Sequence, residues 1–158
     1  MIPLPAALGG TGLVGWRLDD ARFADTWDSG EGAYRVGGRW NAPGTRVIYS
    51  ALDPATAILE VAVHSGFQEL AARPHVLTSF RVPDVSKVFV AQPETLPIEV
   101  EQTRTFGGNL IGMHRVVVIP SAVSRHSWNL LISLPAASGD YQQLTQEPFA
   151  LDTRLARS

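Results

Sequence analysis

The chain of 158 residues contains no cysteine, which excludes disulfides, thiolate metal sites and a cysteine nucleophile. Disulfides are common in exported proteins, and without cysteine the sequence offers no such evidence for export. The cytoplasm is therefore the simplest compartment to expect. The four histidines lack the mutual spacing of metal ligands, and we expect no metal site. Neither a Walker-type loop nor a Gly-x-Gly-x-x-Gly fingerprint occurs, which argues against nucleotide sites of those two kinds.

Excess charge of one sign is also missing. The formal net charge of −2 and the isoelectric point near 6.0 give no global reason to expect direct binding to nucleic acid or to an anionic membrane. A local basic pocket for one small phosphorylated ligand is compatible with these values. We therefore expect a negatively charged ligand to bind in a local pocket and not across an extended basic surface.

Long hydrophobic runs are absent as well. The apolar start, residues 1–10, has no basic residue and is broken by two prolines and two glycines, so we do not expect a signal peptide. The apolar stretch from Val116 to Leu134 is incompatible with a lipid-spanning helix, because it is interrupted by Pro120, Arg125, His126 and Asn129. We expect a protein without a membrane segment.

The length and composition that are present favour one globular domain. A chain of this length is near the commonest single-domain size, and 14 glycines and 11 prolines predict many turns and long connections. We therefore expect one domain over residues 1–158, with a C-terminal tail over about 150–158.

Hydrophobic patterns predict an α+β fold with a largely antiparallel sheet and flanking helices. A polar, glycine-bearing loop that can hold a turn of helix is expected to follow the first strand, up to Gly38. A weaker helix is expected somewhere between Pro97 and Met113, interrupted by the pair Gly107-Gly108. The expected strands are Leu13–Leu18, Arg46–Ala51, Val76–Val82, Lys87–Val90, Arg115–Pro120 and Asn129–Leu134.

The clearest helix start is Asp53-Pro54, an N-cap followed by proline at the first helical position. This helix should run to about Gly66. Its buried stripe is predicted to consist of Ile58, Leu59, Ala62 and Val63. Glu60 and His64, four residues apart, should lie side by side on another face.

Several short motifs occur in one order along the chain and are fairly specific only in combination. They are Trp16-Arg17, the run Gly37-Gly38-Arg39-Trp40-Asn41, Ile48-Tyr49-Ser50-Ala51, the helix segment Ala57-x-x-Glu60-x-x-x-His64, Val118-Ile119-Pro120-Ser121 with Asn129, and Phe149-x-Leu151-Asp152-x-Arg154-Leu155. On these residues the sequence resembles the RES-domain toxins over most of its length. One departure is Ser133-Leu134-Pro135, where the family tends to have an Asn-Pro pair.

The resemblance implies a fold similar to that of ADP-ribosyltransferases and a pocket for NAD⁺ as a consumed substrate. The residues it implies are catalytic Glu60, Tyr49 and Arg39, with Arg17, Arg39, Trp40, Tyr49, His64, Ser121 and Asn129 in substrate binding. Chemistry makes this set sensible. A guanidinium binds phosphates through a bidentate fork, an aromatic face suits nicotinamide, and a carboxylate stabilises an oxocarbenium-like ribose.

Each of these residues also has a structural interpretation. Arg39 after two glycines could support a turn, Tyr49 within a strand could pack in the core, and Glu60 could lie on a solvated helix face. His64 could be a general base, an orienting partner or a structural histidine. Convergence of Arg39, Tyr49 and Glu60 on one cleft would discriminate an enzyme from a nonenzymatic binding module.

The implied activity is cleavage of NAD⁺ at the nicotinamide–ribose bond and transfer of ADP-ribose to a protein target. Phosphate or water as the acceptor would instead give an NAD⁺ phosphorylase or glycohydrolase from the same first step. By resemblance, such a toxin belongs to a type II toxin–antitoxin system and has an antitoxin with a helix-turn-helix DNA-binding part. Contact with DNA would then be made by the partner.

Overall fold

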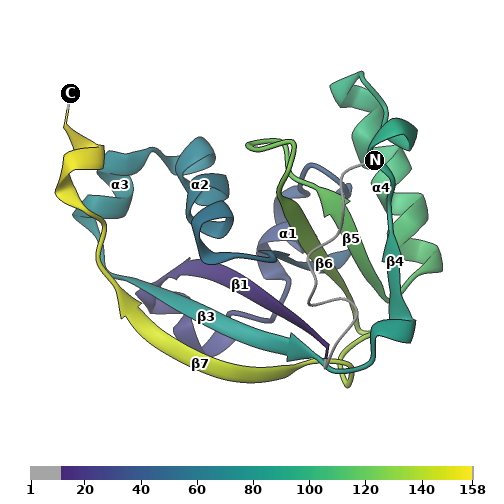
Figure 1. The fold of residues 1–158 in the computed structure, drawn as a ribbon, viewed down its shortest axis with the longest axis horizontal. Coiled ribbons are helices and arrows are strands. Elements are labelled where there is room, and N and C mark those ends of the chain that lie inside the picture. The colour runs from purple at the N-terminus through teal and green to yellow at the C-terminus, as the bar shows by residue number, and fades with distance from the viewer. Residues whose placement is uncertain (1–11, 158) are drawn as a thin grey trace.

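A seven-stranded sheet forms the centre of the fold (Figure 1). The computed structural model describes residues 12–157. In that part the strand order is β4-β5-β6-β2-β1-β3-β7, and every neighbouring pair is antiparallel except β4 with β5. The predicted single α+β domain with a largely antiparallel sheet is confirmed. The strands are β1 (Leu13–Asp20), β2 (Arg46–Ala51), β3 (His75–Val82), β4 (Val88–Val90), β5 (Val116–Pro120), β6 (Trp128–Leu134) and β7 (Gln142–Phe149).

Helices flank the sheet in two groups. Figure 1 shows α2 and α3 beside β1, β3 and β7, with α4 at the far side beside β5 and β4. The α-helices are α1 (Glu31–Val36), α2 (Pro54–Ser65), α3 (Phe67–Ala72) and α4 (Val100–Met113), and the 3-10 turns are η2 (Ala21–Thr26), η3 (Val85–Lys87), η4 (Pro93–Thr95) and η5 (Thr153–Ala156). No helix within residues 12–157 combines the length and apolar character that crossing a membrane requires. The apolar start, residues 1–10, lies outside the described part.

Two apolar clusters sandwich the central strands, because alternate residues of a strand point to opposite faces. Ile48 and Leu130 pack on one face with Trp27 and Phe80. Leu131 packs on the other face in a cluster that also contains Trp40, Val47, Val117 and Ile119. All five residues of β5 are buried, so this strand lies in the interior of the fold.

The predicted start of α2 is confirmed, and the predicted buried stripe is right for two of its four residues, because Ile58 and Ala62 are partly buried against an apolar cluster beside β1 and β3. Leu59 and Val63 are 41% and 67% exposed, whereas Thr56 and Ala57 are buried. Apolar residues occur around most of this helix, so hydrophobicity alone did not choose the face. The sheet does, and the chosen face includes Glu60, which is partly buried.

The predicted interruption of α4 is wrong as well, since the helix continues through Gly107 and Gly108. A Cβ on Gly107 would clash with the carbonyl oxygen of Trp40, whereas one on Gly108 would meet nothing within 4 Å. Close packing of α4 against Trp40 therefore explains the first glycine. The propensity cost of a helical glycine is about 1 kcal/mol, which tertiary packing exceeds.

The C-terminal part differs from the expectation in two respects. The sequence predicted no strand at Gln142–Phe149, where β7 pairs with β3 as an edge strand with mostly exposed side chains. Pro148 lies near its end, where an edge strand tolerates proline. The expected tail over about 150–158 is also wrong: Leu151 is buried against Leu18, Leu70 and others, and the 3-10 turn η5 contacts α3.

Candidate active site

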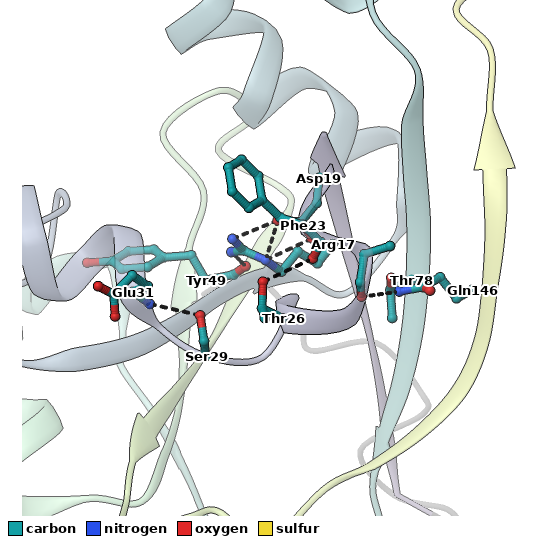
Figure 2. A network of polar contacts seen from close by, with 10 residues as sticks. Arg17, Asp19, Phe23, Thr26, Ser29, Glu31, Tyr49, Thr78 and Gln146 are labelled. Atoms are coloured by element: carbon teal, nitrogen blue, oxygen red, sulfur yellow. Dashed lines mark hydrogen bonds and ion pairs between the residues drawn. The ribbon is translucent and has the colours of Figure 1, made fainter. Parts of the chain in front are cut away.

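Strands β1 and β2 are paired at one position only, and the side chain of Arg17, the first candidate residue, lies where they separate. Trp16 and Ala51 are the single registered pair between these strands, so the carbonyl of Tyr49 lacks a strand partner on that side. Arg17 Nη1 donates to this carbonyl at 2.8 Å (Figure 2). The guanidinium thus satisfies a backbone acceptor that the sheet leaves unpaired.

Arg17 also forms an ion pair with Asp19, at 2.9 Å between Nη2 and Oδ1. Burial raises the pKa of Asp19, and this desolvation outweighs the opposing effect of Arg17. Each Nη of Arg17 keeps one further N–H, because a guanidinium carries five in total. Arg17 is therefore anchored to the protein with donors to spare.

Glu60 is the centre of a second polar group. Its Oε1 accepts hydrogen bonds from Ser121 Oγ at 2.6 Å and from Asn129 Nδ2 at 2.9 Å. Ser121 and Asn129 are 5% and 7% exposed, so the two donors are fixed in the protein interior. The second carboxylate oxygen, Oε2, makes no hydrogen bond within the described residues. A carboxylate oriented in this way has one oxygen bound and one available.

Three elements bring this group together. The side chain of Asp53 accepts a bond from the backbone N of Thr56 at 2.8 Å, which starts α2 and places Glu60 two turns further along. Ser121 follows the last residue of β5 directly. Asn129 is registered with Ile119 of β5 and with Ala51 of β2, so it lies at the same end of the sheet.

A cleft of about 210 Å³ lies beside Ser121. Arg39 and Arg125, both exposed, also line it, and neither forms an ion pair within the described part of the chain. No acidic residue is among those that line the cleft, and the Glu60 carboxylate lies next to it, bonded to Ser121. The remaining lining residues are Trp40, Pro93, Leu96, Pro97, Pro120 and Ala122.

Tyr49 lies beneath the turn that carries Arg39. Its hydroxyl donates to Asn41 Oδ1 at 2.6 Å and accepts the backbone N–H of Trp40 at 3.1 Å. Burial raises the pKa of Tyr49 to about 12, so the phenol is neutral near pH 7. The hydroxyl is engaged with the turn on both its donor and its acceptor side.

The predicted residues thus fall into one connected region, with one exception. Arg39 and Ser121 line the same cleft, Ser121 donates to Glu60, and Tyr49 binds the backbone beside Arg39. Of the three residues expected to converge on one cleft, Arg39 alone is among those that line it. Glu60 is linked to the cleft through its hydrogen bond with Ser121, and Tyr49 through its hydrogen bond with the Trp40 backbone. His64 is exposed and makes no hydrogen bond or ion pair within residues 12–157, so it does not join the group.

Two residues near this site are not recognisable from the sequence alone. Arg125 is in the β5–β6 loop, and nothing in its local sequence distinguishes it from a solvated arginine. Asn41 was part of the Gly-Gly-Arg-Trp-Asn run but was not singled out. It is 1% exposed, and its Nδ2 donates to the carbonyls of Ala33, Ala42 and Thr45.

Within residues 12–157, groups of three or more His, Asp or Glu side chains placed to share a metal ion do not occur. A carboxylate that is bonded to a cleft residue, together with two arginines that line the cleft without an ion pair in the described residues, makes this region a candidate site for a small anionic ligand.

The chain belongs to the RES domain family, which it matches over residues 14–152. Toxin Res of Pseudomonas putida is 28% identical to it, over 90% of this chain and 99% of that protein. Toxin Res of Photorhabdus laumondii is 27% identical, over 92% and 99%. The Prs ADP-ribosylating toxin of Sphingobium sp. is 33% identical, over 75% and 80%. The suspected family is confirmed.

Among solved structures, the crystal structure of the M. tuberculosis MbcT–MbcA toxin–antitoxin complex has a similar chain. The TM-score is 0.70 at 19% sequence identity, and the match covers 88% of this chain and 85% of the other. At this identity the likeness concerns the fold. It agrees with the α+β architecture that the hydrophobic pattern predicts.

Proposed function

We propose that this protein is the toxin of a type II toxin–antitoxin pair that cleaves the nicotinamide–ribose bond of NAD⁺ and transfers ADP-ribose to a protein. The observation that carries the proposal is the Glu60 carboxylate, oriented by Ser121 and Asn129 beside a cleft lined by Arg39. The names Toxin Res and Prs ADP-ribosylating toxin of the similar proteins support it.

Glu60 stabilises the positive charge that develops on the ribose as the glycosidic bond breaks. The bonding electron pair leaves with nicotinamide, and a new bond forms between ribose C1′ and the acceptor, which loses a proton. Because Ser121 and Asn129 engage Oε1, the carboxylate keeps its orientation while Oε2 stays available for the sugar. A charge positioned in advance costs no reorganisation when the bond breaks.

Arg39 binds the phosphates of the dinucleotide, since its exposed guanidinium lines the cleft without a carboxylate partner in the described residues. The cleft volume of about 210 Å³ is below the ~300–1,000 Å³ typical of sites for whole ligands of this size. It therefore takes one portion of NAD⁺, and the rest lies on the surrounding surface.

A protein acceptor is favoured over phosphate or water by the name of the relative that is 33% identical. The same proposal includes an antitoxin with a helix-turn-helix part, action in the cytoplasm and no direct contact with nucleic acid. The slightly negative chain charge is consistent with leaving DNA to the partner.

The test is to incubate purified protein with NAD⁺ labelled in its adenylate part, alone, with phosphate and with cell extract. Nicotinamide release together with label on protein supports the proposal. Release with free ADP-ribose or its phosphorylated product would replace the transferase by a glycohydrolase or a phosphorylase. Folded protein that releases no nicotinamide under any of these conditions would contradict the enzyme function.

A further inference from the structure

The turn that presents Arg39 contains two glycines and is short. Gly37 has a positive φ of 76°, a backbone conformation that side-chain-bearing residues rarely adopt. The Gly38 N–H donates to the carbonyl of Asn41 at 2.9 Å, which closes the turn. A turn with two glycines loses much backbone freedom on ordering, so its orientation depends on contacts from outside.

One set of contacts comes from the sheet side. Tyr49 binds both the Trp40 N–H and the Asn41 side chain, and Asn41 in turn binds three carbonyls. A Cβ on Gly38 would lie 2.6 Å from the Tyr49 hydroxyl oxygen, so the backbone approaches this ring closely. These contacts fix the part of the turn after Arg39.

The part before Arg39 is fixed by a residue that is 66 positions away from Gly38. Arg104, in α4, donates from Nε to the carbonyl of Gly38 at 3.1 Å and from Nη2 to the carbonyl of Val36 at 3.2 Å. One guanidinium thus bridges the two carbonyls that flank Gly37. The side chain is exposed and forms no ion pair within residues 12–157.

We infer that Arg104 is a positioning residue for NAD⁺: it clamps the 36–38 backbone so that Arg39 faces the cleft before substrate arrives. The inference rests on the proposed function. Without the clamp, NAD⁺ binding must also order the turn. The cost is the backbone conformational entropy of about one residue, which weakens NAD⁺ binding about 5- to 30-fold.

Arginine suits this role because its planar fork spans two acceptors at once, whereas the ammonium of lysine is a point donor. Arg104→Lys should therefore recover only a fraction of what Arg104→Gln loses. The charge itself is not the cause, since the acceptors are neutral carbonyls. A matched control is Arg154→Gln, because Arg154 is an exposed arginine of η5 that pairs with Asp152.

The experiment measures kcat and KM for nicotinamide release, the melting temperature, and amide hydrogen exchange over residues 36–41. For Arg104→Gln we expect a rise in KM of about 5- to 30-fold, kcat within about threefold of the parent, and faster exchange in the turn. The melting temperature should stay close to that of the parent, and Arg154→Gln should match the parent throughout.

Combination with Arg39→Ala decides whether Arg104 acts through Arg39. In that background Arg104→Gln should add no further loss, because the guanidinium that it orients is gone. A full additional loss would show that Arg104 acts on its own and would overturn the inference, as would an unchanged KM. If Arg104→Gln fails to fold, Arg104→Lys decides by the same readouts. An inactive parent would instead refute the proposed function and, with it, this role.

Discussion

Replacement of Glu60 by glutamine tests the proposed chemistry most directly. Glutamine keeps the length of the side chain and an oxygen that accepts from Ser121 and Asn129, but it removes the negative charge. The perturbation is therefore electrostatic at the point where charge develops on the ribose. The exposed fraction and the packing of α2 should stay as they are.

The substitution should affect turnover more than it affects stability. Loss of one preorganised electrostatic group commonly lowers turnover about 10²–10³-fold, or about 2.7–4 kcal/mol of transition-state stabilisation. The free energy of unfolding should change less, by about 2 kcal/mol, since two charge-assisted bonds become two neutral ones, each weaker by about 1 kcal/mol. Glu60→Ala would differ, because it leaves the buried side chains of Ser121 and Asn129 without their acceptor.

The assay is the single-turnover rate of nicotinamide release, with NAD⁺ affinity and melting temperature measured in parallel. Glu69→Gln is the matched control, since Glu69 is a glutamate of the neighbouring helix α3 that pairs with Arg73. We expect the parental rate for Glu69→Gln and the full loss for Glu60→Gln. Retention of near-parental turnover in Glu60→Gln would refute the carboxylate mechanism, even if the protein still cleaves NAD⁺.

Three further predictions concern binding, packing and ionisation. Arg39→Ala should weaken NAD⁺ binding by about 1.5–3 kcal/mol, with partial recovery in Arg39→Lys; a collapse of the melting temperature would instead assign Arg39 to turn support. In urea denaturation, Gly107→Ala should lose about 1–3 kcal/mol by clashing with Trp40, whereas Gly108→Ala should gain up to about 1 kcal/mol; equal effects would contradict the packing argument. Because burial raises the pKa of Tyr49 to about 12, stability should fall as pH rises from about 10 toward 12, and less so in Tyr49→Phe; tyrosinate absorbance at pH 10 should be the same in both.

Local patterns in the sequence determined most of the sheet and the start of the key helix. The strand Arg46–Ala51 and the cap Asp53-Pro54 were predicted at their observed positions, because a strand period and an N-cap depend on residues close together in the chain. The combination of motifs also identified the family and selected Glu60, Ser121 and Asn129 as residues of one site.

Local sequence patterns do not predict the strand Gln142–Phe149. Its side chains are mostly exposed and show no apolar alternation, so hydrogen bonding to β3 alone makes it a strand. The buried face of α2 is similar, since apolar residues on both sides left the choice to the sheet. A hydrophobic pattern predicts burial only where the buried face is apolar and the exposed face is polar.

The tertiary structure alone decided how the candidate residues meet. Ser121 directly follows β5, Asn129 is in β6, and Glu60 is in a helix 61 and 69 positions earlier, so their hydrogen bonds exist only after the sheet has formed. Arg104 carries no motif, yet it bridges two carbonyls beside Gly37 because α4 packs closely on Trp40. The sequence by itself determined which side-chain functional groups the candidate site can contain, since these follow from the residue types. The spatial relation between groups distant in the chain follows from packing, which no local pattern encodes.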